Sequence, residues 1–143
     1  MVVFPFVLLA AAPAIARFGH DTAMSESGEM PLLAAQVERA WRAMTPRPLR
    51  FVGGETLAYG VAAYASDRPR ALPGLPAPEP AVLKRDGLAF VCLAEDATCV
   101  TRAKVMAQAE PQSRTIESAI ARNVGGRLAP PRRYTIVLVP PAR

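Results

Sequence analysis

The chain has 143 residues, of which 51% are hydrophobic and 20% charged, with 17 basic and 12 acidic side chains. This length suits one domain of ordinary size, and the apolar content is enough to form a core. A high apolar fraction with mixed charge excludes disorder as a description of the whole chain. Only one segment is apolar enough to enter a bilayer, so these residues cannot form a multi-pass membrane protein by themselves.

That apolar segment is residues 1–16 (MVVFPFVLLAAAPAIA), which carry no charge and end before Arg17. As a helix it would span about 24 Å, short of a hydrocarbon core of about 30 Å. It can be a short membrane helix, a signal-like peptide or the end of a longer membrane helix, and each places the following residues outside the cytoplasm. The alternative is a buried strand in a cytosolic protein. We predict a membrane segment over 1–16 and a polar linker over 17–30.

Residues 31–143 show the spacing of alternating helices and strands. The expected elements are a helix over 31–44, a strand over 49–52, a helix opened by Glu55, an irregular proline-rich stretch over 69–80, a strand over 88–94, a helix over about 97–108 capped by Asp96, a strand around 116–120 and a strand over 134–139. The inward-facing positions are Leu57, Val61 and Tyr64 in the helix after Glu55, and Val100, Ala103 and Ala107 in the helix after Asp96. This order predicts an α/β sandwich of two or three layers, whose mixed sheet ends in an antiparallel hairpin.

Basic residues gather at the carboxyl end of the chain. Residues 111–143 contain six arginines and one glutamate, which accounts for the whole net charge of +5. Such a segment can meet the phosphates of nucleic acid or of lipid headgroups, or it can be a solvated hairpin. Aromatic residues make up only 6% of the chain and do not interleave with the arginines, so we expect no nucleic-acid partner.

Two short motifs are candidates for ligand binding. Gly53-Gly54 lies between a strand and a helix, where backbone amides can hold an anion, although a tight turn is the simpler interpretation. Asp67-Arg68 can contact a sugar or phosphate, or it can be a local ion pair that stabilises a turn. We find no spacing typical of a catalytic group, a metal site or a cofactor site, and we expect none of the three in this chain.

Cys92 and Cys99 enclose six residues across a predicted turn from strand to helix. Two thiols cannot hold zinc alone, and this spacing is not that of a redox motif. In an oxidising compartment the two would form a disulfide; in a reducing one they would be free buried cysteines. The even cysteine count and the exported interpretation of residues 1–16 favour the disulfide.

The block from Trp41 through PLRFVGGETLAYGVAAYASDRP (48–69) resembles the C-terminal soluble region of bacterial family 39 glycosyltransferases, which are relatives of the dolichyl-phosphate-mannose protein mannosyltransferases. The similar features are a helix with a tryptophan, a "PLRYVGG"-like strand and turn, and a helix that ends near an aromatic-x-x-D-R-P, matched here by Tyr64 and Asp67-Arg68-Pro69. The final strand before Pro140-Pro141 is also similar. The resemblance extends over the whole chain, with residues 1–16 in the place of the last membrane helix.

The resemblance implies a multi-pass membrane enzyme that uses a polyprenyl-phosphate-linked sugar donor. The acidic residues of that family lie in an early extracytoplasmic loop, and no residue here matches them, so no catalytic role carries over. We therefore expect a non-catalytic domain over residues 31–143 at the bacterial inner membrane, with residues 17–143 facing the periplasm. Its partner would be membrane lipid or the sugar donor, through the parent enzyme. The alternative is a small secreted or membrane-tethered binding module without enzymatic activity.

Overall fold

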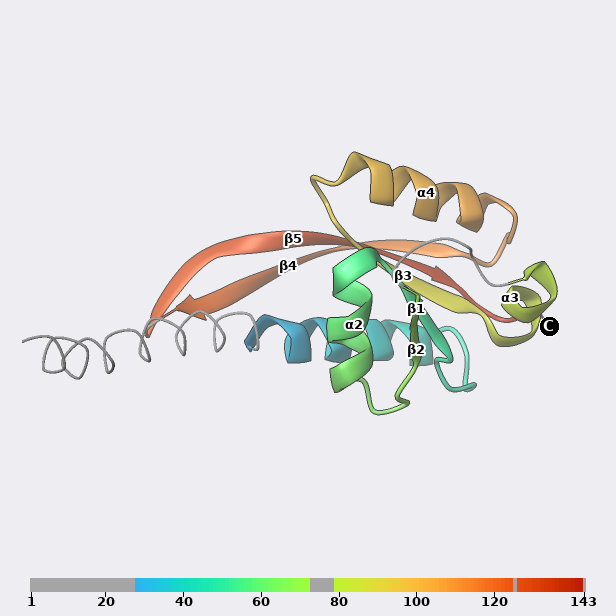
Figure 1. Cartoon of the computed structure of the whole chain (residues 1–143), viewed down its shortest axis with the longest axis horizontal. Helices are drawn as coiled ribbons and strands as arrows, with labels where there is room; N and C mark the ends of the chain where they lie inside the picture. The colour runs from blue at the N-terminus through green and yellow to red at the C-terminus, as the bar shows by residue number, and fades with distance from the viewer. Residues whose placement is uncertain (1–27, 73–78, 125, 143) are drawn as a thin grey trace, which may run out of the picture.

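The computed structural model describes residues 28–72, 79–124 and 126–142. Within them, five strands form one mixed sheet in the order β2-β1-β3-β5-β4, with helices packed on both faces (Figure 1). The predicted α/β sandwich with a mixed sheet and a closing antiparallel hairpin is confirmed.

The parallel half of the sheet consists of β1 (Phe51–Gly53), β2 (Arg70–Leu72) and β3 (Leu88–Leu93). Helix α2 (Glu55–Tyr64) connects β1 to β2, and the short helix α3 (Pro80–Asp86) precedes β3. β1, α2 and β3 are predicted from the sequence, whereas residues 69–80 were expected to form only an irregular stretch. β2 is not visible in the sequence because a strand of three residues beside a proline-rich stretch has too little alternation to detect.

The antiparallel half is the hairpin of β4 (Arg114–Val124) and β5 (Arg127–Val139), with a register shift between Ile120 and Arg122. The hairpin is longer than predicted, because β5 begins seven residues before Tyr134. Pro130 and Pro131 concealed this half of the strand from the sequence analysis. They are tolerated there because β3 pairs only with Tyr134–Val139, which leaves the proline half of β5 paired on one side.

Side chains of β5 alternate between two cores. Tyr134, Ile136 and Leu138 face the helix over residues 28–42 and α2, whereas Val137 and Val139 face α4 (Ala97–Gln108). Asp96 caps α4 as predicted, and its carboxylate accepts a hydrogen bond from the Cys99 N–H at 3.0 Å. The predicted inward positions Ala103 and Ala107 are buried, and Val100 packs against the same core.

Two details differ from the sequence prediction on the face of the sheet that the helix over 28–42 and α2 cover. Helical structure already includes residues 28–30, which the sequence assigned to the linker, and Glu29 is buried. Tyr64 is 50% exposed rather than inward-facing, because the buried positions of α2 are Ala58 and Val61. The predicted membrane segment over 1–16 and linker residues 17–27 lie outside the described residues. No helix in the described part of the chain is both long and apolar enough to cross a membrane.

Candidate functional site

Gly53 and Gly54 form the turn between β1 and α2, and both are buried. A Cβ atom on Gly54 would lie 1.9 Å from the carbonyl oxygen of Val91, and Gly54 has a φ of 131°, which L side chains rarely adopt. A Cβ on Gly53 would lie 2.6 Å from the ring of Phe90. The two glycines therefore allow the turn to pack directly against β3. This contact accounts for both glycines without an anion.

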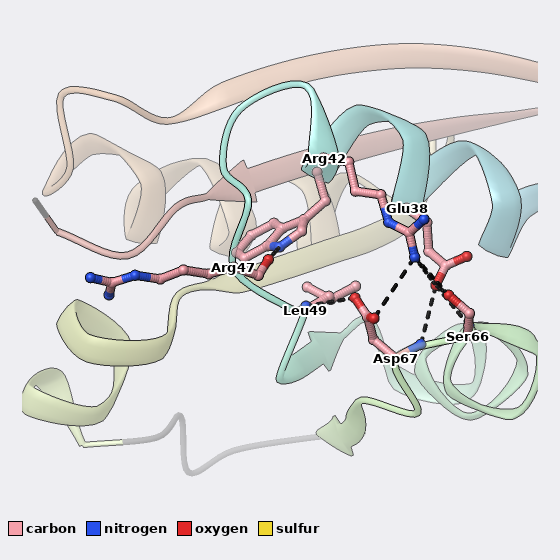
Figure 2. A network of polar contacts seen from close by, with 7 residues as sticks. Glu38, Arg42, Arg47, Leu49, Ser66 and Asp67 are labelled. Atoms are coloured by element: carbon pink, nitrogen blue, oxygen red, sulfur yellow. Dashed lines mark hydrogen bonds and ion pairs between the residues drawn. The ribbon is translucent and has the colours of Figure 1, made fainter.

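Asp67 lies in the turn after α2, where it holds three separate segments together (Figure 2). Its Oδ2 accepts a hydrogen bond of 2.9 Å from the Leu49 N–H, and its Oδ1 lies 3.8 Å from the Arg42 guanidinium. Its own N–H donates to Glu38 at 3.3 Å. The expected ion pair with Arg68 is therefore replaced by one with Arg42, from the helix over 28–42.

The Glu38 carboxylate is the centre of this polar network. It accepts hydrogen bonds of 2.6 Å from both the N–H and the hydroxyl of Ser66, and Arg42 donates to the same hydroxyl at 2.8 Å. Figure 2 shows these side chains pointing toward one another between the helix and the turn. We call Glu38, Arg42, Ser66 and Asp67 the polar clamp. It fastens the helix over 28–42 to the turn between α2 and β2.

The structure does not bring the two candidate motifs together. Gly53-Gly54 precedes α2 and Asp67-Arg68 follows it, so a helix of 10 residues, about 15 Å long, separates them. Arg68 is exposed, has a φ of 48°, and its N–H donates to Ala65. These four residues do not form a common pocket.

Cys92 and Cys99 are joined by a disulfide between β3 and the first turn of α4, with their Cα atoms 5.7 Å apart. The predicted pairing is confirmed. Both cysteines are buried in the core beneath α4, together with Ala103 and Ala107. The bond therefore fixes a helix whose contact with the sheet is made mainly by small side chains.

A hollow that the sequence did not predict lies beside α2. Its volume is about 420 Å³, and it is lined by Glu29, Met30, Thr56, Leu57, Gly60 and Arg132. Glu29 is 1% exposed, accepts a hydrogen bond from the Tyr134 hydroxyl, and lies 3.6 Å from the Arg132 guanidinium. Burial and the hydrogen bond to Glu29 raise the pKa of Tyr134 well above its ordinary value.

No local signal in the sequence could reveal this hollow, because Glu29 and Arg132, which both line it, are 103 positions apart. In the described part of the chain, no group of three or more His, Cys, Asp or Glu residues could hold a metal ion. Comparisons with known proteins gave no matching family model, no similar curated protein and no similar solved structure.

Proposed function

We propose that this chain is the C-terminal extracytoplasmic domain of a bacterial inner-membrane glycosyltransferase that uses a polyprenyl-phosphate-linked sugar donor. The observation that supports a periplasmic location is the Cys92–Cys99 disulfide, since such bonds persist in oxidising compartments such as the periplasm. The transferase assignment rests on the resemblance of Trp41 and residues 48–69 to family 39 glycosyltransferases. In this proposal residues 1–16 enter the membrane and residues 17–143 face the periplasm.

The domain contributes structure rather than catalysis. Transfer from a lipid phosphate needs an acid or base positioned at the reacting atoms. Asp67 and Asp96 already have structural roles, because each accepts a hydrogen bond from a backbone N–H: Asp67 holds a turn, and Asp96 begins a helix. The domain would therefore help to shape the acceptor side of a membrane-embedded site.

The compartment can be tested by alkylation and protease accessibility. In cells that express the chain with its own residues 1–16, we expect Cys92 and Cys99 to resist alkylation without reductant. A protease added to spheroplasts should digest residues 17–143. A matched Cys92→Ala, Cys99→Ala variant shows the background of the labelling. Full protection from protease by an intact inner membrane, with both thiols labelled, would contradict the proposal.

The catalytic part can be tested by sugar release from a polyprenyl-phosphate-linked donor. We expect no sugar release by the purified chain. We expect release by membranes from cells that express a longer polypeptide, which is encoded by this chain's gene together with the region upstream of Met1. In that longer polypeptide, Asp67→Asn should lower thermal stability more than turnover. Turnover by the isolated chain that Asp67→Asn abolishes would contradict the structural role.

A second candidate is a small membrane-tethered binding module without an enzymatic parent. The observation that favours it is the hollow of about 420 Å³ between α2 and Arg132, since concave sites of this size can hold a small ligand. The two candidates differ in the coding DNA upstream of Met1. A transferase domain requires further hydrophobic spans in frame, and a binding module does not.

A further inference from the structure

The hairpin of β4 and β5 projects beyond the two cores of the domain. Tyr134–Val139 of β5 are all buried, whereas Arg127–Arg133 are exposed or half-buried. Figure 1 shows the turn end of the hairpin extending past the start of the helix over 28–42. The five steps of extended strand between Arg132 and Arg127 reach about 17 Å. We call residues 127–133 the projecting half of β5.

This projecting half combines positive charge with exposed apolar surface. It contains Arg127, Arg132 and Arg133, and no acidic residue follows Glu117 in the sequence. Only Arg132 has an ion-pair partner among the described residues, the buried Glu29. Leu128 is 79% exposed, the highest value among the exposed large hydrophobic residues of the described chain. Arginine beside an exposed leucine is the combination that favours the interface of an anionic bilayer.

The position of the projecting half is tied to the start of the described chain. Glu29, at the beginning of the helix over 28–42, contacts both Tyr134 and Arg132 of β5. Eleven residues, 17–27, separate Gly28 from the apolar segment over 1–16. Eleven residues reach at most about 40 Å, so a bilayer that holds residues 1–16 lies within reach of the projecting half.

We propose that the projecting half of β5 is a docking surface for anionic lipid headgroups, on the same bilayer that holds residues 1–16. This proposal rests on the proposed function, which places residues 1–16 in a membrane. A nucleic-acid partner fits less well, because the projecting half has no aromatic side chain on which a base could stack. Docking would bring the tip of the hairpin into the headgroup layer, where side chains on both faces of the strand meet lipid. Arg127 and Arg133, which lie on opposite faces, would contact the phosphates, and Leu128 would reach the apolar boundary.

The test uses the full chain in nanodiscs of brominated lipid, which quench tryptophan that touches the acyl region. Leu128→Trp places a probe on the projecting half, and Val105→Trp places a matched probe on α4, where Val105 is 59% exposed. Trp41 is buried and present in both variants, so it contributes the same background. We expect quenching of the probe at 128 with phosphatidylglycerol, weaker quenching with neutral lipid alone or at high salt, and none at 105.

A second substitution tests the charge. Arg127→Gln, added to Leu128→Trp, should lower the equilibrium constant for contact about fivefold, which is the factor expected for one arginine near an anionic surface, and Arg127→Lys should preserve it. Circular dichroism verifies that each variant is folded. Equal quenching at 128 and 105, or quenching that Arg127→Gln leaves unchanged, would overturn the proposal. So would binding to a single-stranded RNA without any response to phosphatidylglycerol.

Flotation of the same chain with vesicles separates this proposal from the proposed function. If the chain floats with neutral vesicles but the probe at 128 is not quenched in anionic nanodiscs, residues 1–16 anchor the protein and the docking surface is wrong. If the chain fails to float with neutral vesicles, the membrane assignment of residues 1–16 fails. Quenching at 128 that still depends on phosphatidylglycerol and on Arg127 would then support the docking surface by itself.

Discussion

The two faces of the sheet are held by different means. On one face, the helix over 28–42 and α2 bury large side chains, including Trp41, Leu33 and Tyr134 at 0% exposure. On the other, α4 meets the sheet with Cys99, Ala103 and Ala107. Burying a large apolar side chain contributes about 1.5–3 kcal/mol, and an alanine methyl contributes much less. A helix with so small an apolar face needs another means of attachment, and the Cys92–Cys99 disulfide provides it.

Polar contacts follow the same division. The face covered by the helix over 28–42 and α2 has the polar clamp at one end of the helix over 28–42 and the Glu29–Tyr134 hydrogen bond at the other. At the clamp end of this helix, the Trp41 indole N–H also donates to the Arg47 carbonyl at 2.8 Å. On the α4 face, Asp96 caps the helix, and the helix is then held covalently at its first turn. We therefore expect the two faces to respond differently to reduction, to loss of a clamp residue and to alkaline pH.

Removing the disulfide should have the largest effect. Cys92→Ala with Cys99→Ala should lower the free energy of unfolding by about 2.5 kcal/mol, from the loop entropy of a short closed loop. The loss should be concentrated in α4: its amides should exchange with solvent faster, while those of the helix over 28–42 change less. Urea denaturation followed by circular dichroism, with hydrogen exchange, measures both effects.

Reduction of the wild-type protein is the matched control, since it breaks the same bond without changing the side chains. It should reproduce the faster exchange of α4. If the helix over 28–42 lost protection as much as α4 did, the division between the two faces would be wrong.

The ease of prediction also differs between regions. The α4 face could be predicted closely, because Asp96, the spacing of Ala103 and Ala107, and the cysteine pair all lie within 17 consecutive positions (92–108). Local capping, periodicity and loop closure are readable from sequence. The polar clamp and the hollow depend on pairs such as Glu38 with Ser66 and Glu29 with Tyr134, which are 28 and 105 positions apart. Only the fold brings those residues together.

Asp67 illustrates this limit. Its place beside Arg68 suggested a local ion pair, but parallel pairing of β1 with β2 brings its turn next to Leu49 and Arg42. The projecting half of β5 is a second case. Its two prolines hid a strand that needs partners on one side only.

Disrupting the clamp should have an intermediate effect. Asp67→Ala removes the acceptor of the partly buried Leu49 N–H, and losing such a hydrogen bond costs about 0.5–1.5 kcal/mol. Asp67→Asn should cost less, because the amide oxygen can still accept that bond while the ion pair with Arg42 is lost. Arg68→Gln is the neighbouring control and should change stability by less than about 0.5 kcal/mol. Urea denaturation of the three variants ranks them, and an Arg68→Gln loss as large as that of Asp67→Ala would contradict the clamp.

Alkaline pH should have the smallest effect on the free energy of unfolding, and it should act only on the face covered by the helix over 28–42 and α2. Burial and the hydrogen bond to Glu29 raise the folded-state pKa of Tyr134 above its ordinary value of 10.0. The folded state thus favours the neutral phenol, so this contribution to stability is fully present below pH 10 and is lost as the pH rises above it. Each pH unit above 10 should cost about 1.4 kcal/mol relative to Tyr134→Phe, which cannot ionise. Urea denaturation of both proteins from pH 9 to about pH 11 isolates Tyr134, because all other groups are common to the two. A constant difference between wild type and Tyr134→Phe across this range would mean that the Tyr134 hydroxyl ionises as readily in the folded state as in the unfolded one. The buried contact with Glu29 would then not hold the start of the helix over 28–42 against the sheet.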